Sequence, residues 1–326
     1  MRVATIGSGF IVDRMIQTIR EVDGLELYCV YSRTEQKAKD FAEKHKASVY
    51  YTDLIDMLKD PLVDIVYVAS PNSLHYSQSK LALEHGKHVL CEKPFVPSVK
   101  ECENLFDIAQ KNNVYILEAI TNIHLPNFQI VKDNLNRIGE LKMVQCNFSQ
   151  YSSRYLKYKN HEQTNAFDPN FNGGALMDIN VYNIHFVVGM FGKPLNVHYF
   201  KNSGYNDIDT SGILIMEYKD FLVECTGAKD SASPNTIYVQ GDEGTLLVSG
   251  ISNGVLEHVH FMGPKKDLIG KKDEDNRENL GVDQGNHMIY ECKDFVEILQ
   301  GKKQDLYEYC CQETKDVVEI LSQFQN

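Results

Sequence analysis

The first 120 or so residues alternate short apolar runs with amphipathic segments, a pattern that few folds can accommodate. It is typical of βαβ units, in which helices connect the strands of a parallel sheet. An apolar run at 3–6 precedes Gly7-Ser8-Gly9 and a segment whose apolar residues recur at spacings of four, four and three. Further strands are expected at 25–31, 49–51, 65–69, 88–91 and 114–117. The sequence therefore predicts a doubly wound parallel sheet.

Two helices in this part carry boundary signals of their own. Ser98, followed three residues later by Glu101, has the spacing of a capping box, which satisfies two backbone amides at the start of a helix. An earlier helix is expected to end at Gly86.

After residue 121 the pattern changes to period-two alternation with turn residues between the runs, which indicates an open, mostly antiparallel sheet. We expect an α/β domain at 1–121 and an α+β domain at 122–326, with return of the C-terminal helices to the first domain as an alternative. A helix near 174–189 interrupts the strands, and the charged stretch 265–279 is a solvated loop or a cover over a site. The strands are expected at 142–151, 196–201, 212–218, 222–228, 236–240, 245–248 and 255–261, with a hairpin at 241–244.

Charge and composition exclude several classes of protein. Lys and Arg number 33 against 45 Asp and Glu, so the net charge is 33 minus 45, or −12. Such a surface repels nucleic acid and anionic membranes. No apolar run approaches the roughly 18 residues of a membrane span, and a glycine interrupts the first run too early for a secretory segment. We expect a cytoplasmic protein. The eight cysteines are scattered without a CxxC pair, so no metal site is expected.

The turn Gly7-Ser8-Gly9, continued by Phe10 and Ile11, fits a dinucleotide site. Glycines permit the tight turn and let a pyrophosphate approach the backbone at a helix N-terminus. Val12 replaces the third glycine of the motif. The alternative is a structural strand-to-helix turn.

The second strand ends at Tyr31-Ser32-Arg33, where NAD-selective sites usually carry a carboxylate for the ribose 2′-hydroxyl. A small hydroxyl followed by a guanidinium suits the 2′-phosphate of NADP instead. NADP is therefore preferred over NAD, the alternative being that Arg33 is a solvated loop charge.

Glu92-Lys93-Pro94 follows the strand at 88–91, at the edge of the sheet where doubly wound folds bind ligands. A lysine beside a nicotinamide could stabilise negative charge on a reacting hydroxyl. The alternative is an ordinary turn.

On a helix, Asp178, Tyr182 and His185 stand at i, i+4 and i+7 and so share one face. Burying polar groups costs free energy unless they have hydrogen-bond partners, so three polar residues on one helix face require an explanation. It is a reactive face or an internal hydrogen-bond cluster that fixes the helix.

Taken together, these motifs resemble those of the Gfo/Idh/MocA oxidoreductases over essentially the whole chain. The Glu118-Ala119-Ile120 segment and Tyr182 are closer to the branch of dihydrodiol dehydrogenase, xylose dehydrogenase and glucose-fructose oxidoreductase than to inositol dehydrogenase-like members, which usually have histidine at position 182. The matching segments are GxGxxV after the first strand, Ser70-Pro71-Asn72 with His75, Gly86-Lys87-His88-Val89 leading into Glu92-Lys93-Pro94, and Gly173-Gly174-Ala175-Leu176-x-Asp178-Ile179.

The resemblance implies a Rossmann domain, a second domain whose open sheet forms a homo-oligomer interface, and a nicotinamide cofactor in the cleft between domains. It assigns catalysis to Lys93, Tyr182 and Asp178, and substrate contacts to these three and His185. Asn180 departs from the family's usual glycine, which bears on how closely a substrate approaches the helix. The implied cofactor-binding residues are Gly7, Ser8, Gly9, Phe10, Ile11, Ser32, Arg33, Ser70, Pro71, Asn72, His75, Glu92 and Lys93.

The expected reaction is hydride transfer between NADP, or NAD, and a sugar, polyol or related cyclic diol. Free tyrosine has a pKa of about 10, so Tyr182 needs a nearby cation such as Lys93 to carry a proton near neutral pH. Arg154 and Tyr155 either line the substrate pocket or lie on the surface. The alternatives are an enzyme that retains its nucleotide, as in sugar–sugar oxidoreduction or redox-assisted glycoside cleavage, and a non-catalytic NADP-sensing regulator.

Overall fold

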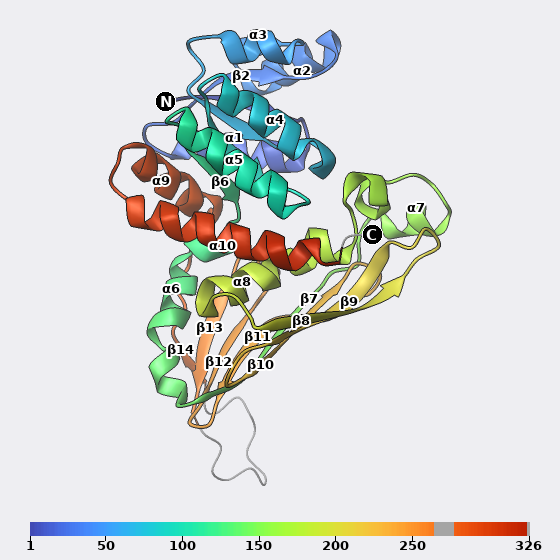
Figure 1. Cartoon of the computed structure of the whole chain (residues 1–326), viewed down its shortest axis with the longest axis vertical. Helices are drawn as coiled ribbons and strands as arrows, with labels where there is room; N and C mark the ends of the chain where they lie inside the picture. Colours follow the sequence, from blue (N-terminus) through green and yellow to red (C-terminus); the bar gives the residue numbers. More distant parts are fainter. Residues whose placement is uncertain (264–276, 325–326) are drawn as a thin grey trace. The chain divides into compact units, whose positions relative to one another are not determined.

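The computed structural model describes residues 1–263 and 277–324. They form two compact units (Figure 1). Residues 1–119 and the two C-terminal helices make the first unit, and residues 120–287 make the second.

The first unit is built on a six-stranded sheet in the order β3-β2-β1-β4-β5-β6 with every pairing parallel, which confirms the predicted Rossmann topology. Its strands are β1 (Arg2–Ile6), β2 (Glu26–Tyr31), β3 (Val49–Tyr51), β4 (Ile65–Val68), β5 (His88–Glu92) and β6 (Ile116–Ala119). Its helices are α1 (Phe10–Glu21), α2 (Glu35–His45), α3 (Leu54–Lys59), α4 (His75–Glu84), α5 (Val99–Lys111), α9 (Met288–Leu299) and α10 (Gln304–Ser322), with a 3₁₀ turn η1 (Asn72–Leu74).

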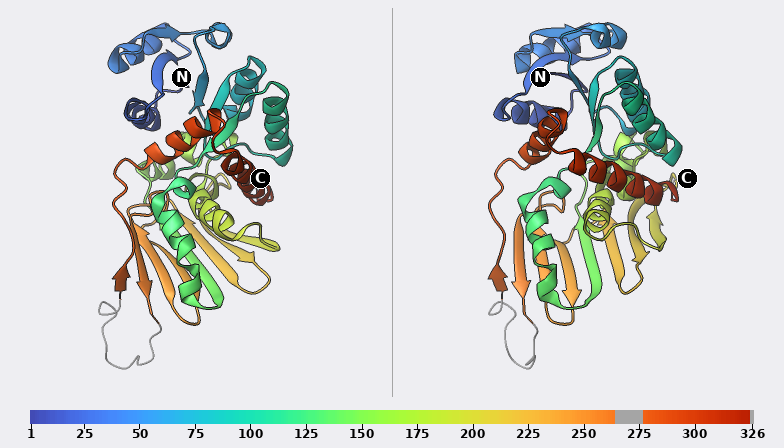
Figure 2. Two further views of the ribbon diagram at one scale, coloured as in Figure 1. Left: turned by 90° about the vertical axis from the view of Figure 1, so that its left-hand side faces the viewer. Right: turned by 60° about the vertical axis from the view of Figure 1, so that its left-hand side comes forward.

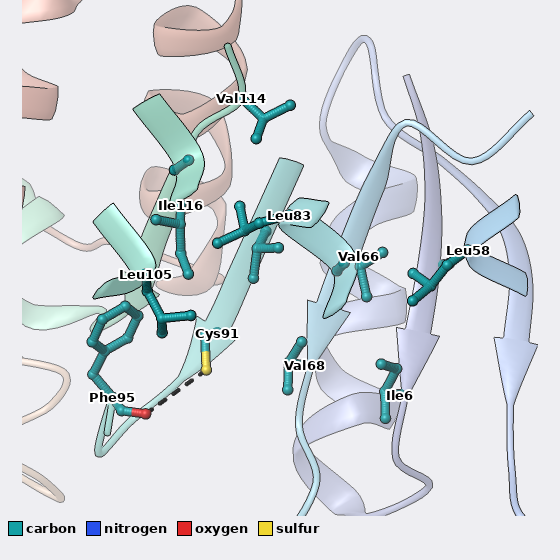
Figure 3. Packing of buried hydrophobic residues seen from close by; sticks show 14 of the residues in the cluster. Ile6, Leu58, Val66, Val68, Leu83, Cys91, Phe95, Leu105, Val114 and Ile116 are labelled. Atoms are coloured by element: carbon teal, nitrogen blue, oxygen red, sulfur yellow. Dashed lines mark hydrogen bonds between the residues drawn. The ribbon is translucent and has the colours of Figure 1, made fainter. Parts of the chain in front are cut away.

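The central strands of this sheet are apolar on both faces because helices cover both, as parallel sheets require. All four residues of β4 are buried. Figure 3 shows Val66 and Val68 of β4 packed among side chains from α4, α5 and the neighbouring strands. The serine half of the predicted capping box is confirmed at α5, where the Ser98 hydroxyl accepts a hydrogen bond from the Glu101 amide at 3.3 Å.

The C-terminal helices belong to the first unit by their contacts. Cys292 of α9 lies 3.5 Å from the sulfur of Met15 in α1, and Val318 of α10 joins the core that the strands form. Thr314 of α10 donates to the buried Glu118 carboxylate at 3.1 Å.

The second unit contains an eight-stranded sheet in the order β14-β13-β12-β11-β7-β10-β9-β8. Only the β7–β10 pairing is parallel among those described, so the predicted mostly antiparallel sheet is confirmed. The strands are β7 (Leu141–Ser149), β8 (Asn196–Ser203), β9 (Asp209–Glu217), β10 (Leu222–Ala228), β11 (Asn235–Gly241), β12 (Thr245–Gly250), β13 (His258–Met262) and β14 (Arg277–Asn279).

Helices α6 (Pro126–Asp133) and α8 (Val181–Phe191) cover one face of this sheet, as the two views of Figure 2 show. Inward residues such as Val144 and Cys225 are buried, whereas the outward residues Met143 and Leu222 are exposed. The other helical segments of the unit are η2 (Asn122–His124), η3 (Leu135–Ile138), α7 (Tyr155–Lys159), η4 (Asn165–Phe167), η5 (Pro169–Phe171) and the π-helical turn η6 (Leu176–Asn180).

Residues 265–276 of the predicted charged loop lie outside the described residues, and its last three residues form β14 against β13. The helix predicted at 174–189 begins as the π turn η6 and continues as α8. None of the helices in the described ranges has the length and apolar character needed to cross a bilayer.

Candidate functional site

The glycine turn lies between β1 and α1, at the carboxyl edge of the parallel sheet. Gly7 has φ +116°, and a Cβ there would lie 2.4 Å from the Ala69 carbonyl oxygen, so only glycine fits. A Cβ on Gly9 would meet no atom within 4 Å. The space beside Gly9 is therefore open where the motif brings a pyrophosphate close to the backbone.

The N-terminus of α1 is available to an anion. Gly9 is the N-cap residue and supplies no side-chain hydrogen bond to the first-turn amides, which carry partial positive charge. Ser8 and Phe10 are exposed beside this turn, whereas Val12 is fully buried and packs beneath Gly7. Replacement of the third glycine of the motif by Val12 therefore changes the packing inside the turn and not its exposed surface.

Ser32 and Arg33 follow β2 at the same edge of the sheet. The Ser32 amide donates to the Tyr51 carbonyl at 3.1 Å, which fixes the turn, and its side chain is half-buried. Arg33 is exposed and makes no ion pair within the residues that the structure describes. Its guanidinium is therefore free to bind a phosphate.

The segment after β4 offers a further polar group. The Ser70 hydroxyl oxygen is buried and has no hydrogen-bond partner among the described residues. His75 is buried, and its two ring nitrogens lie 3.0 Å from the carbonyl oxygens of Ser70 and Pro94. Burial lowers the pKa of His75. His75 thus connects the loops after β4 and β5, and a direct cofactor contact by this residue stays a prediction.

Glu92 and Lys93 differ sharply in environment. Glu92 is buried at the end of β5 and accepts a hydrogen bond from the hydroxyl of Tyr67. Burial raises the pKa of Glu92. Lys93 is half-buried and begins a cis peptide bond to Pro94. Lys93 is therefore the member of the pair that a ligand can reach.

The glycine pair before η6 has a structural cause. Gly174 has φ +103°, and a Cβ there would lie 1.9 Å from the Asp209 carboxylate. That carboxylate accepts hydrogen bonds from the Leu176 amide at 2.6 Å and the Tyr199 hydroxyl at 2.7 Å. Asp209 thus caps the start of the helix that carries Asp178 and Tyr182.

Asp178 forms an ion pair with Lys229, a residue that the sequence analysis did not select. The Lys229 side chain is 4 % exposed and that of Asp178 is 44 % exposed. Lys229 follows β10, and its Nζ also donates to the Ala166 carbonyl at 3.1 Å. No sequence motif marks this lysine, because it lies 51 residues from Asp178.

Tyr182 is the second residue of α8 and is half-buried. Its ring packs against Phe148, with ring centroids 5.8 Å apart, and against Gly254, where a Cβ would approach the ring to 2.9 Å. The Tyr182 carbonyl accepts from the Asn122 side chain at 2.8 Å. The ring is therefore held on two sides, while part of the residue remains exposed.

His185 lies on α8 together with Tyr182, after the π turn that carries Asp178. The π turn places an i→i+5 pattern before α8, which breaks the α-helical spacing on which the predicted common face depends. His185 is fully buried, in contrast to Asp178. A substrate contact by His185 stays a prediction, and its full burial argues against one.

Asn180 belongs to a buried chain of amides. Its Nδ2 donates to the Cys225 carbonyl at 2.9 Å, and its Oδ1 accepts from Asn183 at 2.8 Å, while Asn253 donates to Asn183 at 2.7 Å. Gly227 of β10 makes room, because a Cβ there would lie 2.6 Å from that of Asn180. Asn180 therefore faces the sheet, and the alternative of an internal hydrogen-bond cluster holds for this side of the helix.

Metal ligands are not gathered in the described part of the chain. His258 and His260 form a His-x-His pair on β13 with ring centroids 6.5 Å apart, but no group of three His, Cys, Asp or Glu residues with ligand geometry is found in residues 1–263 and 277–324.

Comparison with family models identifies both units. Residues 1–119 match a model described as an oxidoreductase family with an NAD-binding Rossmann fold. Residues 131–247 match a model described as the GFO/IDH/MocA C-terminal domain.

Similar proteins extend this match to the full length. The scyllo-inositol 2-dehydrogenase (NADP(+)) IolU of Bacillus subtilis is 34 % identical over 99 % of this chain and 95 % of its own. The trans-1,2-dihydrobenzene-1,2-diol dehydrogenase of Xenopus laevis is 26 % identical over 92 % of this chain and 88 % of its own. The solved structure of KijD10, a 3-ketoreductase from Actinomadura kijaniata, has a TM-score of 0.81 at 21 % identity over 100 % of this chain and 97 % of its own.

The fold, with its open glycine turn at the sheet edge, defines a dinucleotide-binding oxidoreductase. The chain belongs to the Gfo/Idh/MocA family, which confirms the resemblance that its motifs predict.

Proposed function

We propose that this chain transfers hydride reversibly between NADP and a carbinol carbon of a sugar, polyol or related cyclic diol. The observation that carries the proposal is the full-length similarity, at 34 % identity, to an enzyme named scyllo-inositol 2-dehydrogenase (NADP(+)). A second full-length relative is named for a cyclic diol. Both names describe oxidation of a secondary alcohol on a six-membered ring, which makes such rings the first substrates to test.

The residues of the first unit fit a phosphorylated dinucleotide. The open space at Gly9 and the uncapped amides of α1 suit a pyrophosphate. Arg33, exposed and without an ion pair among the described residues, suits a 2′-phosphate, and the Ser70 hydroxyl is a buried group that still needs a partner. When bound, the nicotinamide supplies the hydride acceptor or donor.

In the proposed reaction, the proton is transferred by residues of this chain. In the direction of reduction, the Tyr182 hydroxyl donates a proton to the developing alkoxide, and the Lys93 ammonium stabilises the negative charge. Asp178 accepts hydrogen bonds from neighbouring substrate hydroxyls with the exposed part of its carboxylate.

Nucleotide preference is tested by thermal unfolding. Saturating NADPH and NADP⁺ should raise the melting temperature more than NADH and NAD⁺ at matched concentrations, because a ligand that binds only the folded state stabilises it. Arg33→Ala should reduce the shift given by the phosphorylated pair, corresponding to a loss of affinity of about tenfold or more, and leave the shift given by NADH unchanged.

Lys39→Ala is the matched control, because it removes one positive charge from the exposed surface of α2. It should leave all four shifts unchanged. Larger shifts with NADH than with NADPH would contradict the assignment of Arg33 to a 2′-phosphate, and no shift with any nucleotide would contradict the proposed function.

We also propose that the chain forms a homo-oligomer through the open face of the second sheet. Met143 and Leu222 face each other there, as do Phe200 and Ile213, and all four are 40–66 % exposed. Large apolar patches on a surface are typical of interfaces. Light scattering after gel filtration should show a dimer or larger species, and the double variant Phe200→Glu/Ile213→Lys should lower its mass; a monomeric wild type would refute the proposal.

A further inference from the structure

Lys229 is buried at the end of β10, where its charge is costly to keep. Removing an ammonium from water carries a penalty that is recovered only when its donors find good partners. Because the Lys229 side chain is only 4 % exposed, its ammonium loses nearly all of its hydration. An apolar residue could fill the same volume without this desolvation cost.

Three different groups surround the ammonium. Its Nζ binds the Asp178 carboxylate, donates to the Ala166 carbonyl at 3.1 Å, and lies 4.7 Å from the centre of the Phe167 ring. These groups come from the π turn η6 and the 3₁₀ turn η4, so one side chain joins two separate segments to β10. The Phe167 ring is itself packed by Tyr155 and Tyr158.

The two members of the ion pair differ in their exposure to solvent, which a pair that only stabilises the fold does not require. Lys229 is buried, but the Asp178 side chain is 44 % exposed. One carboxylate oxygen, Oδ2, is held by Lys229 from the interior. The carboxylate is thus fixed from behind, while its exposed part remains accessible from solvent.

We propose that Lys229 is a positioning residue for the reaction: its buried ammonium fixes the Asp178 carboxylate and the Ala166–Phe167 segment, so that Asp178 meets the hydroxyl groups of the substrate in a single orientation. This inference rests on the proposed function, because it assigns Asp178 to substrate hydroxyls. Lys229 acts through Asp178 and takes no part in proton or hydride transfer.

The experiment is a double-mutant cycle in the full chain, with NADP⁺ as cofactor and scyllo-inositol, myo-inositol and trans-1,2-dihydrobenzene-1,2-diol as substrates. Lys229→Met should lower kcat/KM by about 100-fold, as expected when a reacting group loses its orientation. In a chain that already carries Asp178→Asn, the same change should alter kcat/KM by no more than about twofold, because the residue through which Lys229 acts has lost its charge.

Two further variants separate positioning from folding. Lys229→Arg keeps a cation beside Asp178 and should recover most of the activity, whereas Lys229→Met should not. Lys142→Met is the matched control: Lys142 forms an exposed ion pair with Glu140 at 2.6 Å on the same sheet, and its loss should leave kcat/KM unchanged. The shift in melting temperature given by NADPH should be the same in every variant, because the nucleotide residues lie in the first unit.

The outcomes distinguish this inference from the proposed function. Independent, multiplicative effects of Lys229→Met and Asp178→Asn on kcat/KM, or a loss of activity in Lys229→Met that merely follows its loss of folded protein, would overturn the positioning role while leaving the dehydrogenase in place. A wild type that binds NADPH but turns over none of the substrates would overturn the proposed function and, with it, this role of Lys229.

Discussion

Replacing Lys93 by methionine is expected to lower kcat for polyol oxidation by about a thousandfold, because the change removes the cation that we propose stabilises the alkoxide. Methionine keeps the length of the side chain but not its charge. The buried neighbours of Lys93, Glu92 with Tyr67 and His75 with the Pro94 carbonyl, are left in place, so the fold should survive. Initial rates with NADP⁺ and scyllo-inositol measure the effect.

The control for this variant is Lys100→Met, at an exposed position in the first turn of α5. It removes the same charge and should leave kcat unchanged. The melting-temperature shift with NADPH should be similar in both variants and the wild type. Near-normal turnover by Lys93→Met would show that the proposed reaction does not depend on this ammonium.

Replacing Tyr182 by phenylalanine is expected to lower kcat by about 100-fold to 10,000-fold, the usual contribution of a positioned proton donor. The ring remains, and so do its contacts with Phe148 and Gly254. The backbone bond from Asn122 to the carbonyl of residue 182 is also independent of the hydroxyl. The measured loss should therefore be chemical, with an unchanged melting temperature.

Tyr238→Phe provides the comparison, because Tyr238 is a half-buried tyrosine of β11 in the same unit. Its activity should equal that of the wild type. If Tyr182→Phe retained more than about a tenth of the wild-type kcat, a general acid–base role for this hydroxyl would be excluded.

The fold of the first unit follows from local signals, and these are strong in its sequence. The predicted strand at 49–51 coincides with β3, and the serine cap at position 98 starts α5 as expected. Each helix of a βαβ unit connects strands that are neighbours in sequence, so periodicity and turn residues suffice. The placement of α9 and α10 is different, because their partners Met15 and Glu118 lie almost 200 residues or more away.

The candidate site was predictable only where its residues belong to a motif. The glycine turn has the local geometry that its sequence predicts, and Gly174 is explained by the close approach of Asp209. The spacing of Asp178, Tyr182 and His185 predicts one face because it assumes an uninterrupted α-helix, and the π turn η6 breaks that assumption. Nothing in the sequence distinguishes η6 from an α-helical segment.

Lys229 and the amide chain through Asn180 could not be found from sequence for a further reason. Their roles come from partners brought close when the π turn η6 packs against β10, such as Asp178 for Lys229 and Cys225 for Asn180. A single lysine at the end of a strand is usually a solvated surface charge. Only its burial shows that it is not.

The first unit is made of two separate stretches of the sequence, and this determines when the protein can finish folding during synthesis. Its sheet is complete once residue 119 has emerged from the ribosome, but α10, which supplies Val318 to the core and Thr314 to Glu118, is translated only after the whole second unit. At about 5–20 residues per second, roughly 200 residues separate the two events by ten seconds or more. During that interval the newly made sheet lacks the contacts that α9 and α10 supply to Met15 and Glu118, so the apolar surface around them is a target for molecular chaperones.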